Sequence, residues 1–170
     1  MTEHQIDTLQ SEYSLWSRTP ERKILQACAK HGVTFVPFSP LGRGFFTGKT
    51  SDVSTLPDND LRCSIARPRF EGQNFIENCK LLEPFADIAQ QNDCSPAQLA
   101  LAWLLAKHDR NMVPIPGTRN IDHMIENAGA AQVDLSDETV GTLDALINES
   151  TVKGRRYTDA RMSEADAEKD

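Results

Sequence analysis

The sequence has no long apolar run and no excess of basic residues, and each absence excludes a class of protein. No stretch approaches the roughly 18 apolar residues of a membrane-spanning helix, and no charged segment followed by an apolar one opens the chain. Its 18 Lys and Arg against 25 Asp and Glu leave a net charge of −7. This balance argues against a nucleic-acid partner or an acidic membrane surface. We expect a cytoplasmic protein.

Metal-ligand spacing is also missing. The cysteines form no C-x-x-C pair, and the histidines form no H-E-x-x-H or comparable motif. We therefore expect free thiols, surface histidines and no bound metal. The residues concerned are Cys28, Cys63, Cys79, Cys94, His4, His31, His108 and His123.

The 170 residues, 39% of them hydrophobic, are enough for about one domain with a core. Residues 6–15 have the alternation of a strand, and residues 19–32 form a helical pattern with Thr19 as N-cap and Gly32 after its end. A second strand follows at residues 33–40. Two strands joined by one helix predict parallel pairing with a right-handed crossover.

The rest of the chain continues this α/β order. A Gly- and Pro-rich segment without periodicity predicts a long irregular loop, which in compact domains is usually functional or disordered. Helical and strand patterns follow, with Pro84 as a possible kink and with Ser95, Pro96 and Ser136 as helix-start signals. The segments are a loop at residues 41–70, helices at 74–92, 95–108, 121–130 and 135–147, and a strand at 111–117.

Three parallel strands cannot close a barrel and expose two sheet edges. The chain therefore has the pattern of part of a larger α/β fold. Residues 1–157 form this part. The basic cluster "KGRRY" at its end reads as a tail motif, and residues 158–170 are expected to be a disordered tail.

The stretch "NMVPIPGTRNIDHMIENAGA" (residues 111–130) combines a strand, a glycine turn and a helix start. The pattern predicts Asn120 as N-cap, and the N–H groups and positive dipole end of the helix would face a ligand above the strand. With the guanidinium of Arg119, this turn suits a phosphate. Taken alone, it also fits an ordinary strand-to-helix turn with a solvated arginine.

Four strings in order carry a family resemblance. "LQSEYSLWSR", "VPFSPLGRGFFTGK", "SPAQLALAWLL" and "VPIPGTRNIDHMIENAGA" resemble the C-terminal half of an aldo-keto reductase, from about residue 6 to residue 157. The resemblance implies a partial (β/α)8 TIM barrel that supplies roughly strands 6 to 8 with their helices. It implies an NADP(H)-dependent carbonyl or alcohol oxidoreductase, with phosphate held after strands 7 and 8.

The resemblance also assigns cofactor-binding residues on the first two strands. Gln10 matches an amide near the nicotinamide carboxamide, and Phe38 matches an aromatic beneath the nicotinamide ring, although without the family Phe38 also fits a core aromatic. The pyrophosphate loop, with its backbone N–H donors, matches Ser39, Pro40, Leu41 and Gly42.

Later positions match cations and the adenosine end of the cofactor. Lys49 and Arg62 match cationic positions of the long loop, and are otherwise solvated charges. Arg119 would favour a 2′-phosphate, and hence NADP over NAD. The remaining matches are Gly117, Thr118, His123, Glu126 and Asn127, of which Glu126 and Asn127 also fit a helix surface.

No catalytic residue is carried over, because the family's Asp, Tyr, Lys and His set lies in the N-terminal half. We therefore expect no activity from this chain alone. It would either act with a complementing N-terminal half or be a non-catalytic remnant or interaction protein prone to self-association. An unrelated Rossmann or flavodoxin-like domain lacks support, since no G-x-G-x-x-G opens a βα unit.

Overall fold

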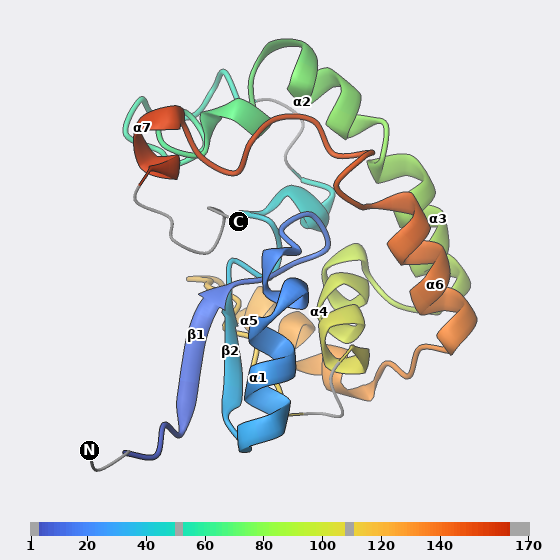
Figure 1. Ribbon diagram of the computed structural model, residues 1–170. Helices are drawn as coiled ribbons and strands as arrows, with labels where there is room; N and C mark the ends of the chain where they lie inside the picture. Colours follow the sequence, from blue (N-terminus) through green and yellow to red (C-terminus); the bar gives the residue numbers. More distant parts are fainter. Residues whose placement is uncertain (1–3, 50–52, 108–110, 164–170) are drawn as a thin grey trace.

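The computed structural model describes residues 4–49, 53–107 and 111–163. Strands β1 (Thr8–Glu12) and β2 (Thr34–Phe38) are parallel, in register from Thr8 opposite Thr34 to Glu12 opposite Phe38. Helix α1 (Ile24–His31) connects them and lies against the sheet in Figure 1. The predicted βαβ unit is confirmed, within shorter strand limits than the pattern indicated.

The start of the connecting helix differs from the prediction. Thr19 does not cap it, because Thr19–Arg22 form a separate 3-10 turn (η1) with Pro20 near its start, and α1 begins only after Lys23. Gly32 ends α1 as predicted, with a left-handed φ of 66° that a residue without Cβ adopts at little cost.

The predicted third strand, residues 111–117, does not form a regular ladder with β2. It makes a single parallel bridge from Met112 to Phe35, although the N–H groups of Val113 and Ile115 donate to Phe35 O and Pro37 O. A further parallel bridge would need an N–H at position 37, which proline lacks. The segment is not covered on both faces, since Val113 and Ile115 are 52% and 44% exposed.

The segment between β2 and the next helix has no α-helix or strand in its described residues, as its composition predicted, but it is packed into the structure. It contains two 3-10 turns, η2 (Phe45–Thr47) and η3 (Arg67–Arg69), and it buries Phe45, Phe46 and Phe70. Trp16 stacks on Phe45 with ring centroids 4.4 Å apart. Through these aromatic side chains, the segment contributes to the hydrophobic core and is not only a solvent-exposed loop.

Six further helices follow in the described residues. α2 (Gly72–Cys79) and α3 (Leu82–Gln91) replace the single helix predicted there; they are separated just before Pro84, which stands in the first turn of α3. α4 (Pro96–Ala106) begins with the predicted Ser95 cap, and Gln98 completes a capping box. The others are α5 (Ile121–Gly129), α6 (Asp137–Leu146) and α7 (Asp159–Met162), with a 3-10 turn η4 (Ala130–Gln132) after α5.

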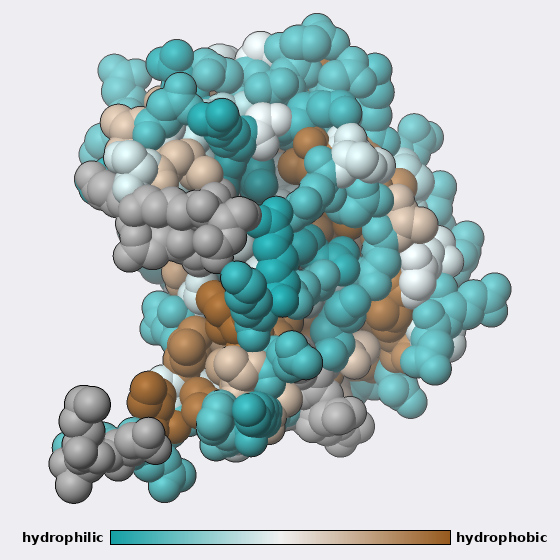
Figure 2. All heavy atoms as spheres, in the orientation of Figure 1, coloured by the Kyte–Doolittle hydropathy of each residue, from teal (hydrophilic) through white to brown (hydrophobic). Residues whose placement is uncertain are grey.

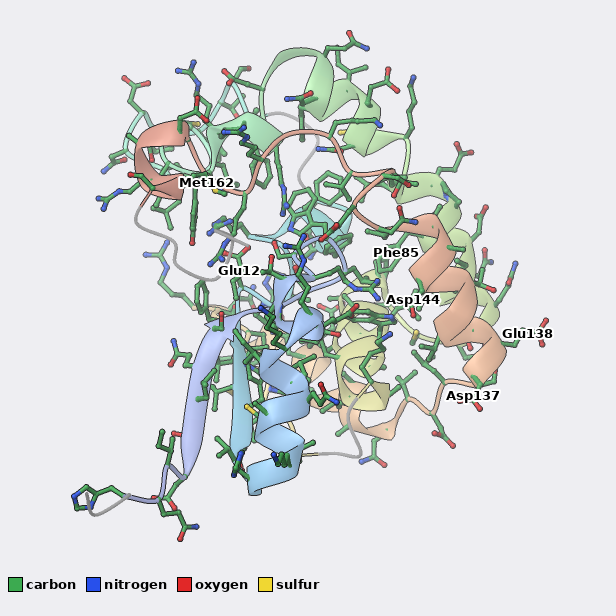
Figure 3. The ribbon with its side chains drawn as sticks, in the orientation of Figure 1. Glu12, Phe85, Asp137, Glu138, Asp144 and Met162 are labelled. Atoms are coloured by element: carbon green, nitrogen blue, oxygen red, sulfur yellow. The ribbon has the colours of Figure 1, made fainter. Side chains whose placement is uncertain are left out.

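Helix α4 is the centre of the core. It lies between the sheet and the pair formed by α3 and α6 (Figure 1). Trp103 on α4 is fully buried, and its Nε1–H donates to Asp144 Oδ1 of α6 at 3.0 Å. Asp144 points from α6 toward α4, whereas Asp137 and Glu138 point outward (Figure 3).

Asp144 also pairs with two cations. Lys107 Nζ lies 2.8 Å from Oδ2, and Arg18 Nη1 lies 3.0 Å from Oδ1. Partial burial raises the pKa of Asp144, but the hydrogen bond from Lys107 and the charges of Arg18 and Lys107 outweigh it, so the pKa lies below its ordinary value. The network joins α6 to α4 and to the segment before η1.

The predicted disordered tail begins with structure. Thr158 N–H donates to Ile65 O at 2.9 Å, and residues 159–162 form α7. Residues 164–170, the rest of that tail, and His108 lie outside the described residues.

Candidate functional site

A cavity of about 470 Å³ opens where β2 and the Met112–Pro116 segment end. Four parts of the chain line it: the turn that follows β2, the long segment around Arg62, the turn and helix that follow Pro116, and the start of α4. A volume of this size is within the range of small-molecule sites. The lining residues are Ser39, Pro40, Leu41, Arg43, Gly44, Thr47, Lys49, Arg62, Ala97, Ile115, Pro116, Gly117, Thr118, His123, Glu126 and Asn127.

The turn after β2 follows an unusual backbone path. Ser39 and Arg43, neither of them glycine, have φ values of 51° and 57°, and Gly42 and Gly44 are also left-handed. A Cβ on Gly42 would stand 2.9 Å from Trp16 Nε1 and 3.0 Å from the Phe46 ring, so glycine is required there. Left-handed residues that are not glycine store strain, which is typical of ligand-binding turns.

Two cations on the cavity wall already have partners. Lys49 Nζ lies 3.0 Å from His123 Nε2, so the loop after η2 meets α5 across the cavity. Arg62 Nε and Nη2 each donate to Asp60 at 2.9 Å. These hydrogen bonds hold the pKa of Asp60 below its ordinary value.

Asn120 caps α5 as predicted. Its side-chain oxygen accepts from the N–H groups of Asp122 and His123, at 2.7 and 3.4 Å. These two donors are therefore not free for a ligand, contrary to the expectation from the sequence. His123, Glu126 and Asn127 project from α5 into the cavity lining, as the three- and four-residue spacing indicated.

Most of the predicted site residues come together around this cavity, and four do not line it. Gln10 is exposed on β1, Phe38 ends β2 half-buried, Gly42 packs under Trp16, and Arg119 is exposed before α5. Phe38 nevertheless lies near a positive charge, because the Arg156 guanidinium carbon is 5.7 Å from the centroid of its ring.

Sequence reasoning missed a buried charge cluster beside the cavity. Glu12 is 1% exposed at the end of β1, and its Oε2 accepts from Arg43 Nη2 at 2.9 Å and from Arg156 Nε at 3.0 Å. Tyr157 Oη lies 3.3 Å from the same oxygen. Figure 3 shows Glu12 at the end of β1 nearest the C-terminal segment. The "KGRRY" cluster is thus part of the packed structure and not a solvated tail motif.

In the described ranges, no group of three or more His, Cys, Asp or Glu side chains is arranged to hold a metal ion. The same residues contain no helix that is both long enough and apolar enough to cross a membrane. The four cysteines are free.

Comparison with known proteins gives consistent matches. The model of the aldo/keto reductase family matches residues 1–148. Aldo-keto reductase yakc of Schizosaccharomyces pombe, whose name carries NADP(+), is 39% identical over 155 residues, 89% of this chain and 45% of that protein. Probable aldo-keto reductase 1 of Glycine max is 40% identical over 154 residues, 91% of this chain and 43% of that protein.

A solved structure is also similar. The glycerol dehydrogenase AKR11B4 from Gluconobacter oxydans superposes with a TM-score of 0.70 at 26% identity, over 82% of this chain and 41% of that one. The chain thus spans less than half the length of the proteins it matches. Because the family model covers most of its residues and two relatives are close to 40% identical, the chain belongs to the aldo-keto reductase family.

Proposed function

We propose that the chain binds NADP(H) in this cavity and supplies the cofactor side of a carbonyl or alcohol oxidoreductase site. The observation that carries the proposal is the meeting of two distant segments, Ser39–Lys49 and Gly117–Asn127, around one cavity with cationic walls. Both segments match cofactor-contacting loops of the family. The yakc relative, which carries NADP(+) in its name, supports the choice of dinucleotide.

The residues present fit a phosphate-bearing dinucleotide. Arg43, Lys49 and Arg62 supply positive charge, and only Glu126 among the lining residues is acidic. Ser39, Pro40, Leu41 and Gly42 would follow the pyrophosphate, while Gly117, Thr118 and Arg119 would hold the adenosine phosphate. His123, Glu126 and Asn127 would contact the adenine end, and Gln10 and Phe38 the nicotinamide.

When bound, NADPH would supply a hydride to a carbonyl carbon, and a general acid must then supply the proton. We assign no catalytic residue of this chain to that role. In our proposal, the chain forms strands 6 to 8 of a (β/α)8 barrel in the cytoplasm, and a complementing N-terminal half contributes the acid–base residues and part of the pocket for a small carbonyl substrate.

The first test is a fluorescence titration of the purified chain with NADPH and with NADH. We expect saturable binding that prefers NADPH, and we expect Arg119→Ala to weaken NADPH binding about tenfold while changing NADH binding little, because only NADPH carries the 2′-phosphate. Arg67→Ala is the control, since Arg67 is also exposed but pairs with Glu71 outside the cavity. A folded chain that binds neither dinucleotide would refute the proposal.

A second candidate is a non-catalytic protein that associates with itself. Large apolar side chains are exposed on the Met112–Pro116 segment and on α5: Val113, Ile115, Ile121, Met124 and Ile125. Figure 2 shows further hydrophobic surface over β1, and Ile6, just before that strand, is 61% exposed. Apolar surface of this kind is typical of an interaction site.

In sedimentation velocity at micromolar concentration, the chain is expected to run larger than its monomer mass of 18.9 kDa. Replacing Val113 and Ile115 together by threonine keeps β-branched side chains but adds hydroxyls, and should shift the chain toward monomer. Ile76→Thr on α2 is the control, because Ile76 is equally exposed but belongs to a different element. A parent chain that sediments as a monomer contradicts this candidate.

A further inference from the structure

Arg43 is the most buried of the three cations that line the cavity, Arg43, Lys49 and Arg62. Its side chain is 9% exposed and lines the cavity. Its Nη2 donates to Glu12 Oε2 at 2.9 Å and to Tyr157 Oη at 3.3 Å. Its Nε is buried and has no partner in the part of the chain that the structure describes. A buried donor left unsatisfied is costly unless something else completes it.

The charge of Arg43 is only partly balanced. Glu12 Oε2, which accepts from Arg43, also accepts from Arg156 Nε. The other carboxylate oxygen, Oε1, accepts from the Ser17 hydroxyl at 2.8 Å. Two guanidinium groups therefore compete for one carboxylate oxygen. The other cations of the cavity differ: among the described side chains Asp60 pairs with Arg62 alone, and Lys49 contacts His123. An anion in the cavity would therefore neutralise the positive charge of Arg43 more than that of Arg62, which its own carboxylate already balances.

The surroundings hold the Arg43 guanidinium in one place. Its backbone is left-handed, with φ of 57°, although it is not glycine. The guanidinium carbon lies 5.3 Å from the centroid of the Tyr157 ring, and the Arg156 guanidinium covers the same ring at 4.5 Å. Strain that persists in this way requires strong surrounding contacts, and here they come from β1 and from the C-terminal segment.

We propose that Arg43 binds the pyrophosphate of the ligand in this cavity, and that Glu12 and Tyr157 are positioning residues that hold its guanidinium at the wall. The inference rests on the proposed function, because the ligand is the phosphate-bearing dinucleotide. It adds a ligand-binding role for Arg43 and a role for the C-terminal segment, 114 residues away along the chain.

The test compares the Kd of NADPH with that of adenosine 2′-monophosphate, which lacks the pyrophosphate and the nicotinamide half. Arg43→Ala is expected to weaken NADPH binding about tenfold or more, and Arg43→Lys, which keeps the charge without the planar fork, about threefold. Binding of adenosine 2′-monophosphate should stay within about twofold of the parent in both variants. A general loss of structure would weaken both ligands together.

Tyr157→Phe removes only a hydroxyl and tests the positioning role. We expect about a threefold loss of NADPH affinity, with the affinity for adenosine 2′-monophosphate retained. Arg155→Ala is the matched control, because Arg155 is a neighbouring arginine that is mostly exposed and pairs with Asp159. It should bind NADPH like the parent.

The outcomes separate the two proposals. If the parent binds NADPH but both Arg43 variants bind it equally well, or if they weaken both ligands alike, the role of Arg43 is overturned and the proposed function stands. If the folded parent binds no NADPH, the proposed function fails, and the assignment of Arg43 fails with it.

Discussion

Replacing Trp103 with alanine is expected to lower the free energy of unfolding by about 3–5 kcal/mol. The indole is fully buried, and its centroid lies 5.5 Å from that of Tyr13 and 4.7 Å from the Arg18 guanidinium carbon. Alanine would leave a cavity between α4, α6 and the segment after β1. It would also remove the indole N–H that donates a hydrogen bond to Asp144.

Urea denaturation checks this effect, because Trp16 remains as the fluorescent reporter among the two tryptophans. Trp103→Phe is the companion variant: it keeps an aromatic ring but loses the hydrogen bond, and should cost about 1–2 kcal/mol. It also gives a measurable value if the alanine variant is unfolded without denaturant. Equal stability of Trp103→Ala and the parent would show that α4 is not the centre of the core.

Gly154→Ala is expected to destabilise the chain by about 3 kcal/mol. Gly154 has φ of 87°, and a Cβ there would collide with the backbone carbonyl oxygen of Pro68. The collision partner is backbone, so the C-terminal segment would have to move away from η3. Arg69 Nε donates to Gly154 O at 3.3 Å, and the buried Asn78 side-chain amide donates to Lys153 O at 2.9 Å and accepts from the Lys153 N–H at 2.8 Å.

Gly141→Ala is the matched control for this effect. Gly141 lies in α6 with nothing within 4 Å of an added Cβ, so alanine should stabilise the helix by about 0.5–1 kcal/mol. Thermal denaturation of the two variants should therefore move in opposite directions. A Gly154→Ala chain as stable as the parent would mean that the segment after α6 docks without this close approach.

Local chemistry was sufficient to predict several elements. Ser95, Asn120 and Ser136 all cap helices in the structure, because a short polar side chain before an apolar run satisfies the first free N–H groups wherever it occurs. The parallel βαβ unit followed from the same kind of local pattern. Most of the candidate cofactor residues also line one cavity, since loops after neighbouring parallel strands meet at the same sheet edge.

Features that depend on distant partners could not be predicted in this way. Glu12 looked like one position of an alternating strand, but its burial depends on Arg156, 144 residues later. The regular third strand failed because of Pro37 on its neighbour, not because of its own residues. The aromatic side chains of the segment after β2 looked like loop residues until Trp16 was placed against them.

The prolines of the Met112–Pro116 segment also restrict how chains can join. Val113 and Ile115 turn their N–H groups toward β2, so residues 114 and 116 face the open edge, and both are proline. That edge offers carbonyl acceptors but no N–H donors at these two positions. Cross-β growth, in which each strand must both donate and accept along its length, is therefore interrupted at these two positions, where a second copy could donate to the carbonyls but could not accept from this edge.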